Sequence, residues 1–312
     1  MTHWSKECFT VQIQKALDAC LAIGESKKEA KRQTSENGRR LSDSKIFSWN
    51  TYRAYMQHAN YFGKWIEKTH PNCRTLGAAR PYVNDWVRER IKQGMSAYTI
   101  KLETAALAKV YGCSTKDFIR TPERIRSNIV RSRGEKARDS HFSAEKNAEI
   151  ITFCRCTGLR RHELAKLRGD QLIRNDDGSY SLSVVSGKGG RDRISPVIGT
   201  PDEIKTVVTR MESAGSDKVW PKIHNAMDVH SFRAEYAMRI YQKYVRPIET
   251  IRRQRMPDPD HHGRSASAVY ICRGDFAGRE YDRAALLEAS RALGHNRVNV
   301  VAEHYLREEQ LK

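Results

Sequence analysis

A basic stretch near the middle of the chain most constrains how this sequence can fold. Between Arg120 and Arg138 seven positions carry arginine or lysine, and Gly134 lies among polar neighbours. A segment of this composition buries little apolar surface, which is typical of a domain boundary. The 312 residues are thereby divided into two pieces, each long enough to bury its own core.

The piece before this boundary is predicted to be helical. Over residues 48–68 apolar residues recur at helical spacing along one side. A second helix is expected after Pro81, which suits a first-turn position, and a third from Ser96, a capping residue, to Tyr111. We expect residues 47–134 to form an all-helical domain.

The first 46 residues show two different patterns. Residues 5–24 have helical spacing of apolar side chains, whereas Glu25–Lys45 has almost none and is rich in lysine and arginine. We expect residues 1–46 to form an N-terminal helix followed by a basic segment. That segment is either a solvated linker or a flexible arm that contacts phosphates.

The piece after the boundary mixes helices and strands. A tight turn is predicted at 175–178, a strand at 180–186 and a returning strand at 193–197, which together make a β-hairpin with Lys188 at its tip. We expect residues 141–312 to form a mixed α+β domain that is mainly helical. Its helices are expected near 143–154, after Gly158, and at 201–213, 230–246, 282–293 and 298–307.

The charge of the chain indicates its partner. Lysine and arginine number 56 and aspartate and glutamate 37, for a formal net charge of +19, which favours a polyanion or an anionic membrane surface. The sequence has no apolar run of about 18 residues and no apolar signal region, so we expect nucleic acid to be the partner. Seven scattered cysteines predict free thiols in a reducing compartment, hence a cytoplasmic, nucleoid-associated protein.

Five motifs in the last half suit the cleavage of DNA without a metal. The transition state of phosphodiester cleavage gathers negative charge, which guanidinium groups stabilise, and the departing alkoxide needs a proton from lysine or histidine. A tyrosine can serve as the nucleophile. In chain order the motifs are Thr157–Leu164 (TGLRRHEL), the hairpin Lys188, His230–Arg233 (HSFR), Leu293–His295 (LGH) and Tyr305.

The order TGLRxxEL, GKGxxxR, HxxR, LGH and tyrosine resembles that of the tyrosine recombinases, or phage integrase family, over about residues 45–312. The resemblance implies a helical, SAM-like core-binding domain and a catalytic domain with a small antiparallel sheet, which form a clamp around DNA. It also implies a site-specific recombinase that cleaves and rejoins DNA with neither metal nor ATP, so no cofactor is expected. The implied catalytic set is Arg160, Lys188, His230, Arg233, His295 and Tyr305.

The resemblance gives three of these residues contacts with the scissile phosphate. Arg160 and Arg233 would clamp it, and His295 would form a hydrogen bond with it. Two other arginines beside these motifs, Arg161 and Arg193, are expected to contact backbone phosphate or solvent instead, as is Arg191.

The remaining three residues would carry bond making and proton transfer. Tyr305 would form a 3′-phosphotyrosyl link. Lys188 would donate a proton to the departing 5′ oxygen, and His230 would assist proton transfer from the attacking phenol.

Two departures from the family pattern bear on assembly. The stretch from Arg233 to Gly294 is long, with an insertion at about 247–281. Within it, Pro257–Gly263 carries aspartates and histidines on a Pro/Gly-rich segment, which we interpret as a loop and not as a metal site. A short tail follows Tyr305, which leaves open whether a C-terminal segment is exchanged between subunits.

The preferred interpretation is an integrase of a mobile element. A resolvase or invertase of the same chemistry is the enzymatic alternative, and a non-catalytic DNA-binding regulator is the alternative from another class. The expected partners are a double-stranded recombination site and further copies of the chain, four protomers on two duplexes. Affinity for DNA is expected to fall steeply with salt.

Overall fold

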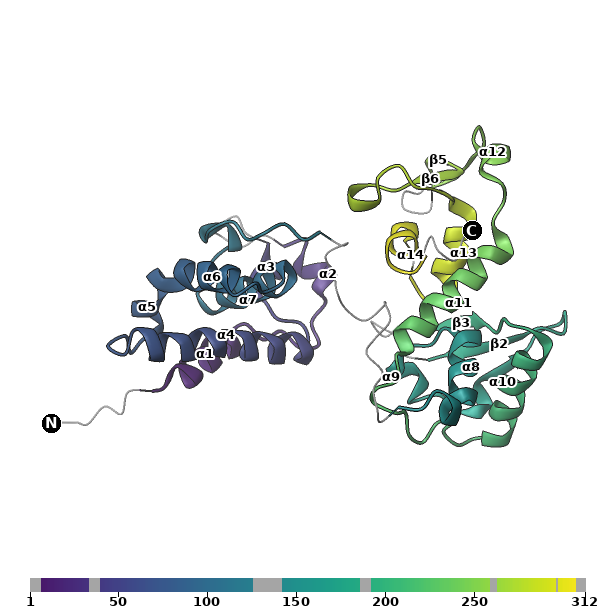
Figure 1. Ribbon diagram of the computed structural model, residues 1–312, viewed down its shortest axis with the longest axis horizontal. Helices are drawn as coiled ribbons and strands as arrows, with labels where there is room; N and C mark the ends of the chain where they lie inside the picture. The colour runs from purple at the N-terminus through teal and green to yellow at the C-terminus, as the bar shows by residue number, and fades with distance from the viewer. Residues whose placement is uncertain are drawn as a thin grey trace. The chain divides into compact units, whose positions relative to one another are not determined.

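The computed structural model describes residues 7–33, 40–125, 142–185, 192–258, 263–295 and 297–306. The chain divides into two compact units, Met1–Asn128 and Ile129–Lys312, coloured purple to blue and teal to yellow (Figure 1). Each unit has its own clusters of buried apolar side chains. Among the described residues, no helix combines the length and the hydrophobicity that crossing a bilayer requires.

The described part of the first unit is built from helices. Its longest helix is α4, and Ser48 caps that helix by accepting a hydrogen bond from the Thr51 N–H. Ser96 caps α7 in the same way, as the sequence predicts. The elements are α1 (Phe9–Asp18), α2 (Lys27–Ala30), α3 (Leu41–Ser44), α4 (Trp49–Thr69), α5 (Leu76–Ala79), η1 (Arg80–Tyr82), α6 (Val83–Lys92), α7 (Ala97–Val110) and η2 (Thr115–Asp117).

The N-terminal helix α1 shares one core with α4, α6 and α7. Phe9 and Ile13 of α1 are buried with Phe62 of α4, Trp86 of α6 and Leu107 of α7. The helix is shorter than the expected span 5–24, and it ends at Asp18. Its apolar stripe is therefore covered by this unit, and α1 lies alongside α4 in Figure 1.

The basic segment Glu25–Lys45 differs from the expected solvated linker where the structure describes it. Ala30 of α2 and Ser42 of α3 are buried. The Lys109 ammonium group of α7 donates hydrogen bonds to the carbonyls of Asp43 and Lys45. Tertiary contacts of this kind leave no trace in hydrophobic periodicity, which explains why the sequence favoured a linker.

The described part of the second unit mixes helices with three small antiparallel sheets, as expected for an α+β domain. Helix α11 packs against both α8 and α13. The elements are η4 (Glu145–Asn147), α8 (Ala148–Thr157), α9 (Arg161–Leu164), η5 (Gly169–Gln171), β1 (Leu172–Arg174), β2 (Tyr180–Val184), β3 (Arg193–Pro196), α10 (Pro201–Ala214), α11 (Val229–Tyr244), α12 (Ile248–Ile251), β4 (Arg255–Pro257), β5 (Ser265–Ser267), β6 (Val269–Ile271), η6 (Gly274–Phe276), β7 (Glu280–Asp282), α13 (Arg283–Ala292) and α14 (Val298–His304).

The largest sheet has the order β1-β2-β3, and all its pairs are antiparallel. Strands β2 and β3 form the expected hairpin, with Val184 paired to Arg193 and Ser181 to Pro196. The tip of this hairpin, residues 186–191, lies outside the described residues. Strand β1 was not predicted, because its three residues are too short to show alternation.

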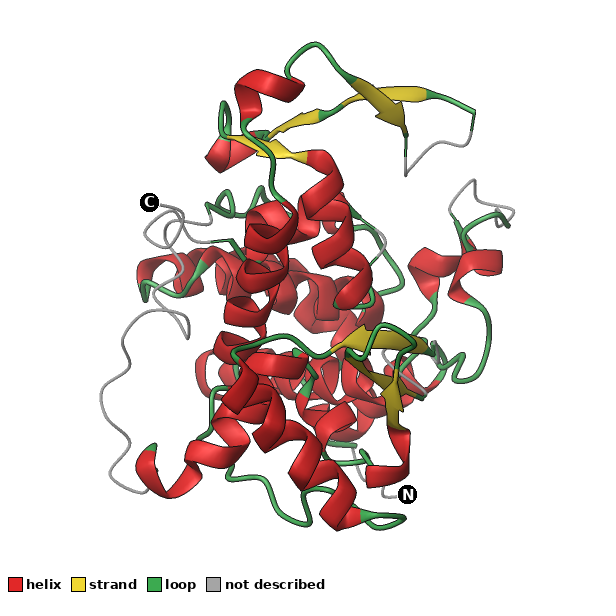
Figure 2. Cartoon of the chain, turned by 90° about the vertical axis from the view of Figure 1, so that its right-hand side faces the viewer, coloured by secondary structure: helices red, strands yellow, loops and turns green. Residues whose placement is uncertain are grey.

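The expected insertion at about 247–281 folds into α12 and two two-stranded sheets, β4–β5 and β6–β7 (Figure 2). Strand β6 coincides with the strand expected near Val269–Cys272. The buried Asp282 carboxylate ties the end of the insertion to Arg246, which donates from its Nε, its Nη2 and its backbone N–H. Among the described residues, no group of three or more His, Cys, Asp or Glu side chains forms a metal site.

Candidate active site

The turn between α8 and α9 places Arg160 beside the buried centre of the second unit. Gly158 adopts a left-handed conformation, with φ of 61°. A Cβ at this position would lie 2.1 Å from Cδ1 of Tyr236, so only glycine fits here. The helix expected after Gly158 is α9, which is short and ends at Leu164.

Glu163 of α9 is a buried carboxylate with four donors. The Arg160 N–H donates to Oε2 at 2.9 Å and the Arg160 guanidinium to Oε1 at 2.6 Å. Arg193 of β3 donates to both oxygens, at 2.9 and 2.8 Å. Burial alone would raise the pKa of Glu163, but the hydrogen bonds from Arg193 and Arg160 hold it well below its usual range. Glu163 is therefore an anion that joins two cations.

Arg233 of α11 is the most deeply buried cation of the site, with 1% of its surface exposed. Its guanidinium donates to the carbonyls of Gly158 and Leu293, and its Nε donates to the Tyr305 hydroxyl at 3.4 Å. Burial lowers its pKa to about 10, so the group stays charged at neutral pH. These carbonyls fix the guanidinium without cancelling its charge.

His295 and Tyr305 complete the buried cluster. Helix α13 ends at Ala292, and Gly294, with φ of 67°, forms the turn that precedes His295. The His295 Nε2 lies 3.3 Å from Nη2 of Arg160, 3.4 Å from Nη2 of Arg233 and 3.4 Å from the Tyr305 hydroxyl. Tyr305 immediately follows α14 and is 5% exposed.

His230 lies at the edge of this cluster, one helical turn from Arg233 on α11. Its ring packs edge-on against the ring of Tyr305, with centres 5.5 Å apart at an angle of 81°. The side chain is exposed. It borders a hollow of about 220 Å³ that is lined by Arg160, Arg161, Met227, Asp228, Val229, His230 and Arg233.

The structure therefore brings five of the six expected site residues together: Arg160, His230, Arg233, His295 and Tyr305. The sixth, Lys188, lies outside the described residues, as does Arg191. Two guanidinium groups and an imidazole near one phenol could together hold an anion close to the phenol oxygen.

Two arginines that were expected to contact phosphate or solvent form hydrogen bonds within the protein. Arg161 donates to the carbonyls of His224, Asn225 and Met227, in the loop that leads into α11. Arg193 has 9% of its side chain exposed and pairs with Glu163. The expectation is thus wrong for Arg193, whereas a phosphate or solvent contact of Arg161, which also lines the hollow beside His230, stays a prediction.

The sequence carries no signal for the inward direction of Arg193. Apolar alternation would place Ile194 inward, but Ile194 is exposed and Ser195 is buried, so Arg193 shares the inward face of β3 with Ser195. Arg161 has no sequence signal either, because its partners are backbone carbonyls more than sixty residues away.

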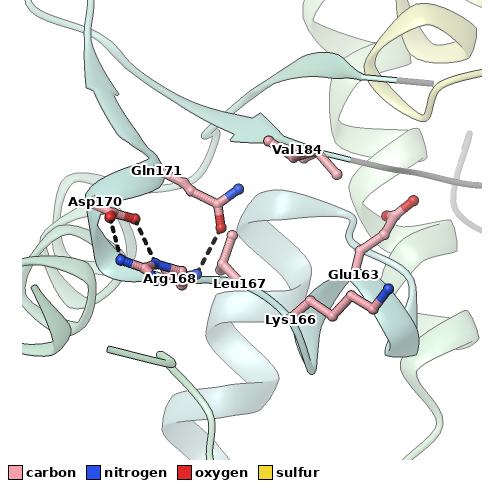
Figure 3. Close-up of a pocket in the computed structure, with 8 residues that line it drawn as sticks. Glu163, Lys166, Leu167, Arg168, Asp170, Gln171 and Val184 are labelled. Carbon is pink, nitrogen blue, oxygen red and sulfur yellow. Dashed lines mark hydrogen bonds and ion pairs between the residues drawn. The ribbon is translucent and has the colours of Figure 1, made fainter. Parts of the chain in front are cut away.

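A larger pocket of about 430 Å³ also borders Glu163 and lies between α9, η5 and the end of β2 (Figure 3). Arg168 forms an ion pair with Asp170 at 2.9 Å on its wall, and Val184 lies on the opposite side. Of the expected catalytic residues that the structure describes, none lines this pocket. The candidate active site is the smaller hollow beside His230.

Solved structures share this fold. A crystal structure of the XerH site-specific recombinase bound to palindromic difH substrate, a post-cleavage complex, covers 99% of this chain and 95% of its own, with a TM-score of 0.55 and 14% identity. The match to the XerH pre-cleavage complex with difH substrate covers 98% of this chain and 95% of the XerH chain, with a TM-score of 0.51 and 13% identity. No protein-family model and no curated protein sequence matches the chain. The likeness shows that the chain has the fold of a tyrosine recombinase, as its motif order predicted.

Proposed function

We propose that this chain is a site-specific DNA recombinase that cleaves and rejoins DNA through a covalent 3′-phosphotyrosyl bond to Tyr305. One observation carries the proposal: the Tyr305 hydroxyl lies 3.4 Å both from Nε of Arg233 and from Nε2 of His295. A phenol oxygen between a fixed guanidinium and an imidazole is well placed to attack a phosphate that the same cations bind.

The cleavage step balances in atoms and charge. The Tyr305 oxygen attacks phosphorus and loses its proton to His230, while the bond from phosphorus to the 5′ oxygen breaks. Lys188 protonates that oxygen. Arg160, Arg233 and His295 hold the non-bridging oxygens, whose negative charge increases in the transition state. Attack by a 5′ hydroxyl reverses the step and rejoins the DNA, since the phosphotyrosyl bond preserves the phosphoester energy.

The charge of the chain and its fold support DNA as the partner. A net charge of +19 favours a polyanion, and the XerH structures that share the fold are complexes with DNA substrates. We propose that residues 47–134, with helix α1 packed into the same core, form the core-binding domain and residues 141–312 the catalytic domain. Four protomers would act on two duplexes, because recombination needs four strand cleavages.

A covalent trapping assay tests the chemistry. The full chain is incubated in EDTA with a pool of nicked duplexes of random sequence, labelled at the 5′ end of the nicked strand, and adducts are recovered after denaturation. The proposal expects adducts that carry the 5′ label and a common sequence, and their loss in Tyr305→Phe. Absence of adducts, or a requirement for a divalent metal, would refute the proposal and favour a non-catalytic DNA-binding regulator.

The proposed cellular role is integration and excision of a mobile element. The recovered sequence allows this role to be compared with that of a resolvase or invertase. Two copies of the recovered sequence are tested in three arrangements. They lie on separate DNA molecules, as direct repeats on one plasmid, or as inverted repeats on one plasmid. Joining of separate molecules supports an integrase, whereas products restricted to one plasmid support a resolvase or invertase.

A further inference from the structure

Arg193 of β3 connects three segments of the candidate active site. Its Nη1 and Nη2 atoms donate to the two oxygens of Glu163 at 2.9 and 2.8 Å. Its Nε donates to the Ala292 carbonyl at 3.2 Å, near the end of α13. With 9% of its side chain exposed, Arg193 is screened from solvent on nearly all sides. This geometry suits a support for neighbouring groups better than a contact with DNA.

Glu163 depends on Arg193 for its charge balance. The same carboxylate binds the guanidinium and the N–H of Arg160. Arg193 satisfies Glu163 from the other side with two parallel bonds, so the negative charge is shared between two cations. Without Arg193, the Glu163 carboxylate would pair with Arg160 alone and would neutralise the positive charge of its guanidinium group.

The sharing of Glu163 leaves the buried cluster with a net positive charge. Arg160, Arg193 and Arg233 carry three positive charges in the buried cluster and Glu163 carries one negative charge. The surplus is two positive charges. A phosphodiester attacked by a phenolate carries two negative charges in its transition state, which that surplus matches.

Arg193 also supports the turn that carries His295. A Cβ at Gly294 would lie 2.7 Å from the Arg193 Cδ, so the arginine side chain packs directly on this turn. The neighbouring Leu293 carbonyl accepts hydrogen bonds from both Arg160 and Arg233. A change at position 193 therefore reaches both guanidinium groups and His295.

We propose that Arg193 is a positioning residue for phosphoryl transfer, which holds Arg160 through Glu163 and holds the His295 turn through the Ala292 carbonyl. It touches neither the phosphate nor the nucleophile. This proposal rests on the proposed DNA cleavage by Tyr305. It adds an explanation of how Arg160 keeps its positive charge available to bind the phosphate.

The test compares single-turnover cleavage of the trapped sequence by Arg193→Met, Arg193→Lys, Arg160→Ala and the double variant Arg193→Met/Arg160→Ala. Arg193→Met should be slower than wild type by about 100-fold, since a displaced cation loses about that factor. Arg193→Lys should recover part of the rate. The rate loss in the double variant should be smaller than the product of the two single losses, because Arg193 acts in part through Arg160.

The matched control is Arg239→Met. Arg239 of α11 forms a similar two-bond pair with Glu203, at 2.8 and 2.9 Å, away from the site. This variant should lose stability without a change in cleavage rate. If Arg193→Met fails to fold, Arg193→Lys and its combination with Arg160→Ala carry the same comparison. Multiplicative losses in the double variant, or an unchanged rate in folded Arg193 variants, would overturn the proposal.

A second readout needs no DNA, and so separates this proposal from the proposed cleavage. The Arg160 N–H donates to Glu163, and its hydrogen exchange in the full chain is measured by NMR. Arg193→Met should speed exchange at Arg160, whereas Arg239→Met should leave it unchanged. Missing adducts with wild type would refute cleavage alone, and unchanged exchange at Arg160 in the Arg193 variants would refute the positioning role.

Discussion

The Nε of Arg233 donates a hydrogen bond to the Tyr305 hydroxyl across 3.4 Å, although the two residues are 72 positions apart in the chain. The guanidinium carbon also lies 5.7 Å from the centre of the Tyr305 ring. A buried cation beside the phenol oxygen stabilises the negative charge that develops there as the oxygen attacks. In the proposed mechanism, this one side chain would both bind the phosphate and stabilise the attacking oxygen.

Arg233→Lys should slow single-turnover DNA cleavage by about 10²- to 10³-fold, the range seen when one fixed donor to a developing oxyanion is lost. Lysine keeps the charge but cannot reach the carbonyls of Gly158 and Leu293 and the Tyr305 hydroxyl together. The control is Arg239→Lys on the same helix, which should cleave at the wild-type rate. Equal rates for wild type and Arg233→Lys would remove Arg233 from the proposed site.

Lys188→Ala should cleave ordinary DNA slowly and recover on a substrate with sulfur in place of the 5′ bridging oxygen. A thiolate departs without a proton, so the proton donor is no longer needed. Rates of adduct formation on the two substrates give the comparison, with Arg160→Ala as the variant that sulfur should not rescue. Failure of sulfur to rescue Lys188→Ala would assign Lys188 a different role.

Gly158→Ala should destabilise the chain by about 3 kcal/mol or more, because it combines a left-handed conformation with overpacking. The added Cβ would lie 2.1 Å from the Tyr236 ring. Gly178→Ala is the matched control, since Gly178 also has positive φ, of 80°, but no atom lies within 4 Å of its added Cβ. Urea denaturation of both variants gives the difference; equal losses of stability would contradict the close packing of Gly158 on Tyr236.

Asp282→Asn should lower stability at neutral pH by about 2 kcal/mol, the value of hydrogen bonds to a charged group. Burial alone would raise the pKa of Asp282, but the bonds from Arg246 and the Ala284 N–H lower it below its usual value near 3.8. A depressed folded-state pKa contributes stability above the unfolded-state pKa, and that stability is lost as pH falls through the folded-state value.

The difference in unfolding free energy between wild type and Asp282→Asn should therefore be constant near neutral pH and shrink below about pH 4. Denaturation curves measured over this range test the prediction, with the exposed Asp176→Asn as control. A difference that stays constant to the lowest pH would show that the carboxylate contributes no linked protonation.

Much of the fold follows from the sequence wherever regular periodicity decides the structure. Apolar spacing predicts a helix at 48–68, and the structure has Trp49–Thr69. The hairpin of β2 and β3 follows from alternation and turn residues. The short strand β1 and the packing of Ala30 and Ser42 do not, because they depend on contacts between distant segments.

The candidate site also contains residues that the sequence predicts and residues that it does not. Residue type and chain order predict Arg160, Arg233, His295 and Tyr305, since the required chemistry narrows the choice of side chain. The inward direction of Arg193 is visible only once β3 is known to place Ser195 in the core. A charged residue near an expected DNA-binding motif can therefore be assigned as a DNA contact only when the direction of its side chain is known.

The most direct test of the central claim is the identity of the residue that carries the DNA. Trypsin cleavage after Arg297 and Arg307 releases the peptide Val298–Arg307, which contains a single tyrosine, Tyr305. After nuclease digestion of the trapped adduct, mass spectrometry should find the nucleotide remnant on Tyr305 of this peptide. A remnant on any other residue, or an adduct that persists in Tyr305→Phe, would contradict cleavage by Tyr305.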